Sequence, residues 1–242
     1  MIKFEKTEVM NFEGAFRGLR NPLNSWDKSD SGICSVGYCD DKCPYRLTIC
    51  DGINPDDFVI GENDLALAQK LIKAGSDHRK FMRQIFVSVD ITAPLYWWKE
   101  FDTYKVGTVA NSCSTMHTVH KKEFTLDDFS HEHLINEPLV EIEPGIVKQF
   151  NLRAKGMLEI IISILNASRL MYLETNDKKY WWQMIQLLPT SYNQKRTVTL
   201  SYENLRNIYG SRRNHKLDEW SIGFMEWIDS LPYAEELIKY GA

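Results

Sequence analysis

The segment from Tyr96 to His117, "YWWKEFDTYKVGTVANSCSTMH", constrains the fold more than any other part of the chain. It begins with large aromatic side chains at a spacing that predicts a buried helix, namely Trp97, Trp98, Phe101 and Tyr104. Pro94 stands where that helix can begin. The small polar residues that follow do not alternate with apolar ones, so we expect a loop there and not a strand. The segment therefore predicts a buried helix that leads directly into a polar loop.

The bulk composition is that of an ordinary globular protein. The chain has 242 residues, of which 43% are hydrophobic and 26% are charged. No linker rich in Pro, Gly or Ser divides it, so we expect one domain over residues 1–242. The net charge of −4 argues against a nucleic-acid partner. No window approaches the roughly 18 consecutive apolar residues of a membrane span, and Met1 to Met10 carries acids, so we expect no membrane partner and a cytoplasmic location.

Four of the five cysteines lie close together in the sequence, at Cys34, Cys39, Cys43 and Cys50. Their intervals lack the C-x-x-C spacing that is typical of structural zinc sites. Disulfides are also rare in a reducing cytosol. We therefore interpret them as free thiols and expect no metal site, with a metal or redox role as the alternative.

The remaining pattern predicts a helix-rich α/β fold with few strands. Gln84 to Ile91 alternates between polar and apolar residues, as a strand does. Further predicted elements are helices over 65–74 (capped by Asp64 and ended by Gly75), 144–173, 178–188, 203–209 (closed by Gly210) and 217–228, a capping box at Thr125 and Asp128, and a strand over 196–202. Residues 14–61 are expected to be mostly loop.

Three polar clusters are candidates for a binding site. In the first, Asn111, Ser114 and Thr115 offer an amide and hydroxyls that can hold a phosphate, although a polar loop or helix cap has the same composition. Cys113 and His117 are four residues apart, which would suit a thiol–imidazole pair on one helix face, but no third residue orients them.

The second cluster is "AGSDHRKFMR", in which His78, Arg79 and Lys80 precede a strand and can meet an anionic cofactor or form a solvated turn. The third cluster is dense in cations: Lys195, Arg196, Arg206, Arg212, Arg213, His215 and Lys216. Guanidinium groups suit phosphate or a pyrimidine carbonyl, and a solvated basic face is the alternative. Three clusters with matching anion-binding chemistry favour a binding site over three unrelated surfaces.

In their order along the chain these clusters resemble the flavin-dependent thymidylate synthases. "GSDHRKF" resembles that family's His-x-Thr element, with His78 at the His and Lys80 at the Thr. "ITAPLYWWKEF" resembles its strand end and aromatic helix, and Asn111 and Ser114 match the Asn and Ser of its signature. Towards the C-terminus the resemblance runs from Leu188 to Arg212.

The resemblance implies an α/β homotetramer that binds FAD. It implies methylation of dUMP at carbon 5 of uracil, with methylenetetrahydrofolate as the carbon donor and NADPH as the reductant. The cofactor residues that it implies are His78, Lys80 and Asn111, and Arg79 and Lys105 are expected at the cofactor as partial replacements for the charges of the family's Arg-His-Arg signature. It places Ser114, Thr115, Lys195, Arg196 and Arg212 at the nucleotide, with Ser114 and Arg212 as the catalytic pair.

The sequence also departs from the family. Thr103, Tyr104 and Lys105 stand where an Arg-His-Arg signature is expected, and Met116 stands in place of another Arg. Each lost charge-assisted hydrogen bond is worth about 1.5–3 kcal/mol. Two alternatives therefore stay open: a non-catalytic nucleotide-binding or regulatory protein on the same scaffold, and an enzyme that modifies another pyrimidine nucleotide.

Overall fold

The structure is a computed structural model that describes residues 2–33, 58–138, 140–143, 146–149 and 153–242. It consists of two compact units built from several segments each. Unit 1 comprises Met1–Glu5, Val89–Lys105 and Ala110–Val198, and unit 2 comprises Lys6–Ser88, Val106–Val109 and Thr199–Ala242. The predicted cysteine cluster lies outside the described residues. The prediction of one domain over residues 1–242 stays a prediction.

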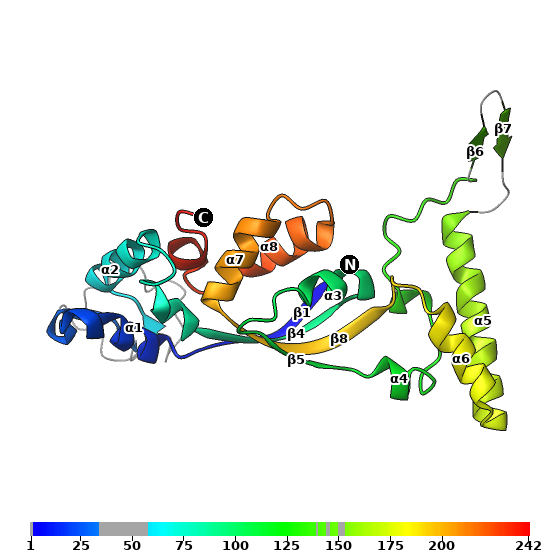
Figure 1. The fold of residues 1–242 in the computed structure, drawn as a ribbon, viewed down its shortest axis with the longest axis horizontal. Coiled ribbons are helices and arrows are strands. Elements are labelled where there is room, and N and C mark those ends of the chain that lie inside the picture. The colour runs from blue at the N-terminus through cyan, green and yellow to red at the C-terminus, as the bar shows by residue number, and fades with distance from the viewer. Residues whose placement is uncertain (1, 34–57, 139, 144–145, 150–152) are drawn as a thin grey trace, which may run out of the picture. The chain divides into compact units, whose positions relative to one another are not determined.

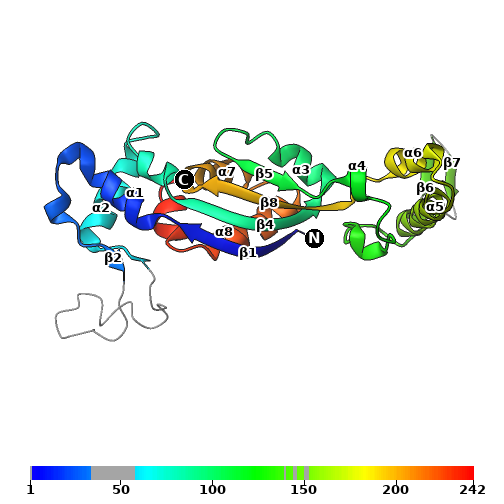
Figure 2. The same cartoon turned by 90° about the horizontal axis from the view of Figure 1, so that it is seen from below.

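A four-stranded sheet has the order β1-β4-β8-β5 (Figure 2). Its strands are β1 (Lys3–Met10), β4 (Phe86–Pro94), β8 (Asn193–Ser201) and β5 (Val109–Ser112). In β4 the alternate residues Val87, Val89 and Ile91 are fully buried, because successive side chains of a strand point to opposite faces. The two predicted strands are confirmed as β4 and β8, and the α/β fold class with a small sheet is confirmed with them.

The helices of unit 1 are α3 (Leu95–Phe101), α4 (Thr115–Thr118), the 3₁₀ turn η4 (Leu126–Asp128), α5 (Ala154–Thr175) and α6 (Lys178–Leu187). A hairpin of β6 (Val140–Glu143) and β7 (Ile146–Gln149) precedes α5. Helices α5 and α6 lie side by side (Figure 1). The chain turns between them because Asn176 ends α5 in a left-handed conformation and the Asp177 side chain caps the start of α6. Their apolar faces meet around Leu165 and Met184, which are fully buried.

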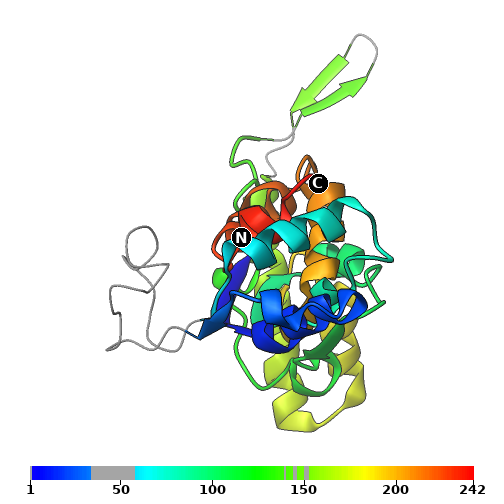
Figure 3. The same cartoon turned by 90° about the vertical axis from the view of Figure 1, so that its left-hand side faces the viewer.

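The first helices of unit 2 are α1 (Phe12–Arg20) and α2 (Glu62–Lys73), which face the viewer in Figure 3. Its other elements are η1 (Asn21–Leu23), η2 (Trp26–Lys28), β2 (Gly32–Ile33), β3 (Phe58–Val59), η3 (Lys80–Arg83), α7 (Tyr202–Arg212), the π-helical turns η5 (Glu219–Phe224) and η6 (Ala234–Ile238), and α8 (Met225–Asp229). The paired residues of β2 and β3 are Gly32 with Val59 and Ile33 with Phe58.

Several expectations about local structure are wrong. Residues 12–20 form a helix and not a loop, because Phe12, Phe16 and Leu19 share one buried face. The expected loop after the aromatic helix contains β5, whose residues are exposed and therefore show no apolar alternation. The helix expected over 144–173 begins only at Ala154, after the β6–β7 hairpin. Gly210 lies inside α7 instead of closing it.

Asp64 is not a helix cap. Helix α2 begins at Glu62, and the Asp64 side chain is fully buried, where it accepts a 2.6 Å hydrogen bond from Arg20 Nε. The capping box at Thr125 and Asp128 is confirmed, and so is the end of α2 before Gly75, which has a φ of 107°.

Among the described helices, α5 is the one whose length and apolar composition would suffice for a membrane span. Its most apolar window has a mean hydropathy of 1.3, and only 17% of that window is buried. This is a weak signal, because core helices of soluble proteins have similar compositions. The exposed apolar side chains of α5 are Met157, Ile160, Ile164, Leu170, Met171 and Leu173.

Candidate functional site

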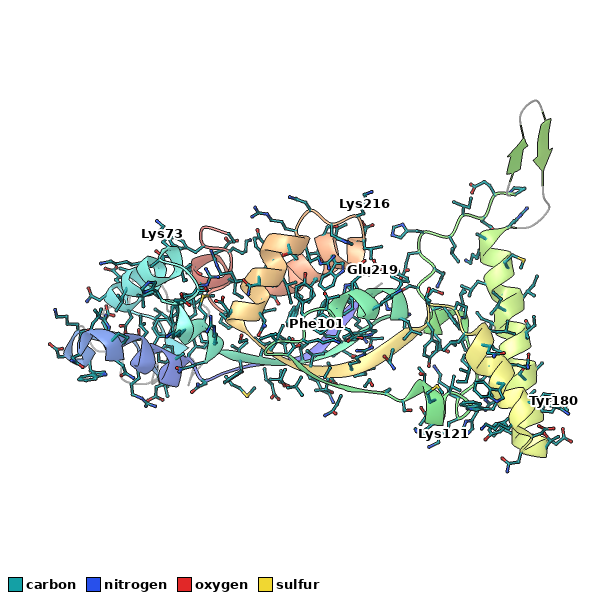
Figure 4. The ribbon with its side chains drawn as sticks, in the orientation of Figure 1. Lys73, Phe101, Lys121, Tyr180, Lys216 and Glu219 are labelled. Carbon is teal, nitrogen blue, oxygen red and sulfur yellow. The ribbon has the colours of Figure 1, made fainter. Side chains whose placement is uncertain are left out.

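The aromatic helix α3 forms a rigid floor within unit 1. Trp97, Trp98 and Phe101 are buried, and the ring of Phe101, labelled in Figure 4, stacks on Trp97 at a centroid distance of 5.1 Å. Trp98 Nε1 donates a 2.9 Å hydrogen bond to the carbonyl oxygen of Gln194 on β8. The helix is therefore tied to the strand that carries two of the predicted phosphate ligands.

The polar segment 111–115 joins β5 to α4. Ser114 is the N-cap of α4, and its Oγ accepts a hydrogen bond from the His117 N–H at 3.1 Å. An accepting hydroxyl keeps its own proton available for donation to a ligand oxygen. Asn111 is exposed, whereas Ser114 and Thr115 are half-buried. The segment thus presents an amide and two hydroxyls on a defined backbone.

The Gln194 side chain clamps this segment to β8. Its Nε2 donates to the Cys113 carbonyl oxygen at 2.8 Å, and the Cys113 N–H donates to the Lys195 carbonyl oxygen at 2.9 Å. Both backbone groups of Cys113 are therefore fixed by neighbouring residues of one strand. Gln194 is only 8% exposed, so these bonds are protected from competition by water.

Lys195 lies between two carboxylates. Its Nζ is 3.1 Å from Asp90 Oδ2 and 3.2 Å from Glu5 Oε2. The hydrogen bond to Asp90, followed by that to Glu5, raises the pKa of Lys195, and the ammonium side chain remains 40% exposed. Lys195 is thus a charged and accessible group, but its charge is already balanced by the neighbouring strands.

Arg196 contacts the other end of the Gln194 side chain and links it to α3 and Asp102. Its Nε donates to Gln194 Oε1 at 2.9 Å, its Nη1 lies 2.7 Å from Asp102 Oδ1, and its guanidinium stands 4.2 Å from the Trp98 ring centroid. The side chain is therefore held flat against the aromatic floor. Lys105 is exposed, and its side chain has no ion pair with any residue that the structure describes.

In unit 2, three of the predicted cofactor residues, His78, Arg79 and Lys80, lie at the start of η3. Arg79 forms a two-pronged pair with Glu203 on α7, with distances of 2.8 Å from Nε to Oε2 and 3.0 Å from Nη2 to Oε1. His78 and Lys80 flank it and are exposed. Within the described chain neither side chain has a hydrogen bond or ion pair, so both are open to an anionic ligand.

Arg212 is at the last turn of α7 and is half-buried. Its guanidinium lies 5.1 Å from the ring centroid of Trp220. A cation held over an indole keeps its edge N–H groups in a fixed plane, which suits recognition of a planar ring carbonyl.

The structure brings some of the predicted residues together and separates others. In unit 1, the polar segment adjoins Lys195 and Arg196 through the β5–β8 pairing. In unit 2, Glu203, the partner of Arg79, is in the first turn of α7 and Arg212 is in its last turn, so these two positions lie at opposite ends of the helix. Cys113 precedes α4, so the expected helix face shared by Cys113 and His117 is not formed. Among the described residues, no cluster of three or more His, Cys, Asp or Glu has the arrangement of a metal site.

The sequence-based reasoning missed the carboxylates and the amide that hold these cations: Glu5, Asp90, Asp102, Gln194 and Glu203. The one signal in the sequence was the polar face of the strand over 84–91, which contains Asp90. The other pairs join positions far apart in the chain and have no local pattern.

The fold is that of a helix-rich α/β protein with a small sheet, and solved structures have a similar fold. No family model and no curated protein matches the sequence. Thymidylate synthase X from Helicobacter pylori, solved with FAD and dUMP, has a TM-score of 0.61 at 14% identity and covers 98% of this chain and 97% of its own. A second structure of the Helicobacter pylori flavin-dependent enzyme with FAD and dUMP gives 0.60 at 15% identity, with 97% of each chain covered.

A UMP/dUMP methylase, PolB from Streptomyces cacaoi, bound with 5-Br UMP, has a TM-score of 0.57 at 13% identity and covers 100% of this chain and 95% of its own. The chain therefore has the fold of the flavin-dependent thymidylate synthases. The resemblance seen in the sequence is confirmed at the level of the fold.

Proposed function

We propose that the protein is an FAD-dependent enzyme that binds dUMP and methylates carbon 5 of its uracil. The observation that carries the proposal is the likeness in fold, over 98% of the chain, to an enzyme solved with FAD and dUMP. The carbon donor in this proposal is methylenetetrahydrofolate, NADPH is the reductant, and the protein is cytoplasmic.

The chemistry of the donor set fits both anionic ligands. FAD carries a pyrophosphate, and the exposed side chains of His78, Lys80, Lys105 and Asn111 offer hydrogen-bond donors for it, with ammonium groups on the two lysines. The charge of Arg79 is already balanced by Glu203. Its proposed role is therefore to orient the residues on either side of it, His78 and Lys80, and not to neutralise the phosphate charge. When bound, FAD supplies the hydride that the methylation requires.

The chain's own residues would bind and polarise the nucleotide. Ser114 and Thr115 donate hydroxyl hydrogen bonds to the phosphate of dUMP, and Lys195 and Arg196 add positive charge beside them. Arg212 lies against the uracil and stabilises the negative charge that develops on the ring as carbon 5 becomes nucleophilic. None of these roles requires a protein nucleophile.

A homotetramer is part of the proposal. The side chains of Ile160, Ile164, Leu170 and Leu173 on α5 are 43–60% exposed, and burial against further copies would remove their apolar surface from water. Such burial is worth about 25 cal/mol per Å². Sedimentation of the purified chain would measure the assembly.

One observation favours a second candidate, a nucleotide-binding protein without catalysis or one specific for another pyrimidine nucleotide. Lys195, Arg196 and Arg79 are each paired with a carboxylate of the same unit. A site whose cations are already balanced attracts a dianionic phosphate less strongly. A UMP/dUMP methylase of similar fold was solved bound with 5-Br UMP, which supports a candidate specific for another pyrimidine nucleotide.

The test is to purify the protein, record its visible spectrum, add FAD, and titrate dUMP and UMP by calorimetry. The proposal predicts a yellow protein that binds dUMP more tightly when FAD is present. A colourless protein that takes up no added FAD would overturn the enzyme proposal. Nucleotide binding without oxidation of NADPH would favour the second candidate.

A further inference from the structure

A cavity of about 360 Å³ lies in unit 2, between α1 and the chain that follows this helix. Its lining includes Phe16, Arg17, Arg20, Trp26, Ser29 and Phe58. None of these residues belongs to the set proposed for FAD or the nucleotide. The lining is therefore a separate group of aromatic and cationic side chains.

Aromatic rings form one part of the cavity wall. Phe16 is buried, and its ring centroid is 5.7 Å from that of Phe58. Trp26 is 53% exposed, but its indole is fixed because Nε1 donates a 2.8 Å hydrogen bond to Asn21 Oδ1. A half-exposed indole in a fixed plane offers a flat surface on which an aromatic ring can stack.

The other part of the wall is cationic and preorganised. Arg20 is buried and donates from Nε to Asp64 at 2.6 Å and from Nη2 to the Lys28 carbonyl oxygen at 3.1 Å. Asp64 also accepts from Ser29 Oγ at 2.7 Å, so it fixes the loop opposite α1. A wall that is ordered before binding needs little further ordering when a ligand enters.

Arg17 is the accessible cation of this wall. It is exposed, and its side chain has no hydrogen bond or ion pair within the described part of the chain. The described lining also holds the carboxylate of Glu13. Because Arg20 is balanced by Asp64, Arg17 is the guanidinium of the described lining that remains open to an anionic group.

We infer that this cavity binds a flat aromatic molecule with a single anionic group, its ring against the aromatic wall and its anion paired with Arg17. The anion is the phosphate of a nucleoside monophosphate or the carboxylate of an aromatic acid. The inference goes beyond the proposed methylation, because the cavity uses none of the residues of that site. One lining residue, Phe16, packs on Phe81, with 5.7 Å between ring centroids. Phe81 directly follows Lys80, one of the residues proposed for FAD.

The test is calorimetric titration of the full chain with three probes: AMP, adenosine and 4-aminobenzoate. Binding of AMP or of 4-aminobenzoate supports the inference and identifies the anion as phosphate or carboxylate. Arg17→Ala and Trp26→Ala should each weaken the bound probe about tenfold, because each removes one charge-assisted bond or one stacking surface. Arg17→Lys should restore part of the loss.

Matched controls are Arg153→Ala and Trp182→Ala, which change an exposed Arg and an exposed Trp of unit 1 and should leave the affinity within about twofold. Three results would overturn the inference: no binding of either anionic probe, equal affinity for adenosine and AMP, or an unchanged affinity in Arg17→Ala. A colourless protein that binds AMP through Arg17 would retain this inference and overturn the proposed function. A yellow protein that binds neither anion would do the reverse.

Discussion

Replacement of Gln194 by glutamate tests whether the polar segment must be clamped for nucleotide binding. The change keeps the shape of the side chain but replaces the Nε2 donor with an oxygen, which would face the Cys113 carbonyl oxygen across 2.8 Å. An acceptor that faces an acceptor loses a hydrogen bond and adds repulsion. The contact from Arg196 Nε to Oε1 is kept and becomes an ion pair, so the hydrogen bond that is lost is the one at the Nε2 end.

The expected cost is about 1–3 kcal/mol, since Gln194 is 8% exposed and the clamp is shielded from water. If that cost is imposed on the conformation that binds nucleotide, the Kd for dUMP rises by about 5- to 150-fold. Calorimetric titration of the FAD-loaded protein measures this Kd.

The control is Gln186→Glu, which adds the same charge at an exposed position of α6 in the same unit. It should leave the Kd for dUMP within about twofold of the unchanged protein. A Gln194→Glu protein that is folded and binds dUMP as tightly as the unchanged protein would refute the clamp and, with it, the assignment of the polar segment to the phosphate.

Three further predictions follow from other contacts. Asp64→Asn leaves the buried Arg20 without a counter-ion and should lower the free energy of unfolding by about 3–5 kcal/mol in urea denaturation. Burial acts to raise the Asp64 pKa, but hydrogen bonds from Ser31, Ser29 and Arg20 outweigh it and lower that pKa. The stabilisation is therefore complete above pH about 4 and is lost as pH falls through the folded-state pKa, so the variant should show a flatter acid profile. Arg212→Ala should lower kcat for dUMP methylation about 100-fold with a smaller change in KM, and equal effects on both would contradict its role at the ring. Lys105→Ala should weaken FAD about tenfold in fluorescence titration, whereas the matched variant Lys121→Ala should not.

Local sequence patterns predicted those helices and strands that bury one face, because their apolar residues recur at short intervals along the chain. The strand β4 and the helix α3 were predictable because their apolar residues repeat at periods of 2 and about 3.6. Strand β5 was not, since all four of its residues are exposed and it is recognisable only by its pairing in the sheet. Helix α1 was missed because its glycines and arginines suggest a turn, although its buried face is apolar.

The candidate site was predictable in its cations and not in their partners. Arg79 and Glu203 are 124 residues apart, and Lys195 and Glu5 are 190 apart. No local signal links such positions, because only the folded chain brings them together. The resemblance to the flavin-dependent enzymes supplied the proposed ligands of the cations from motif order, and it could not supply the carboxylates that pair with these cations in the folded chain.

The most direct measurement is the mass of the nucleotide produced when the purified protein is incubated with dUMP, FAD, NADPH and methylenetetrahydrofolate labelled in its methylene carbon. The account predicts thymidylate that carries the label, formed only when FAD is present. Recovery of unchanged dUMP from a folded protein that has bound both FAD and dUMP would contradict it.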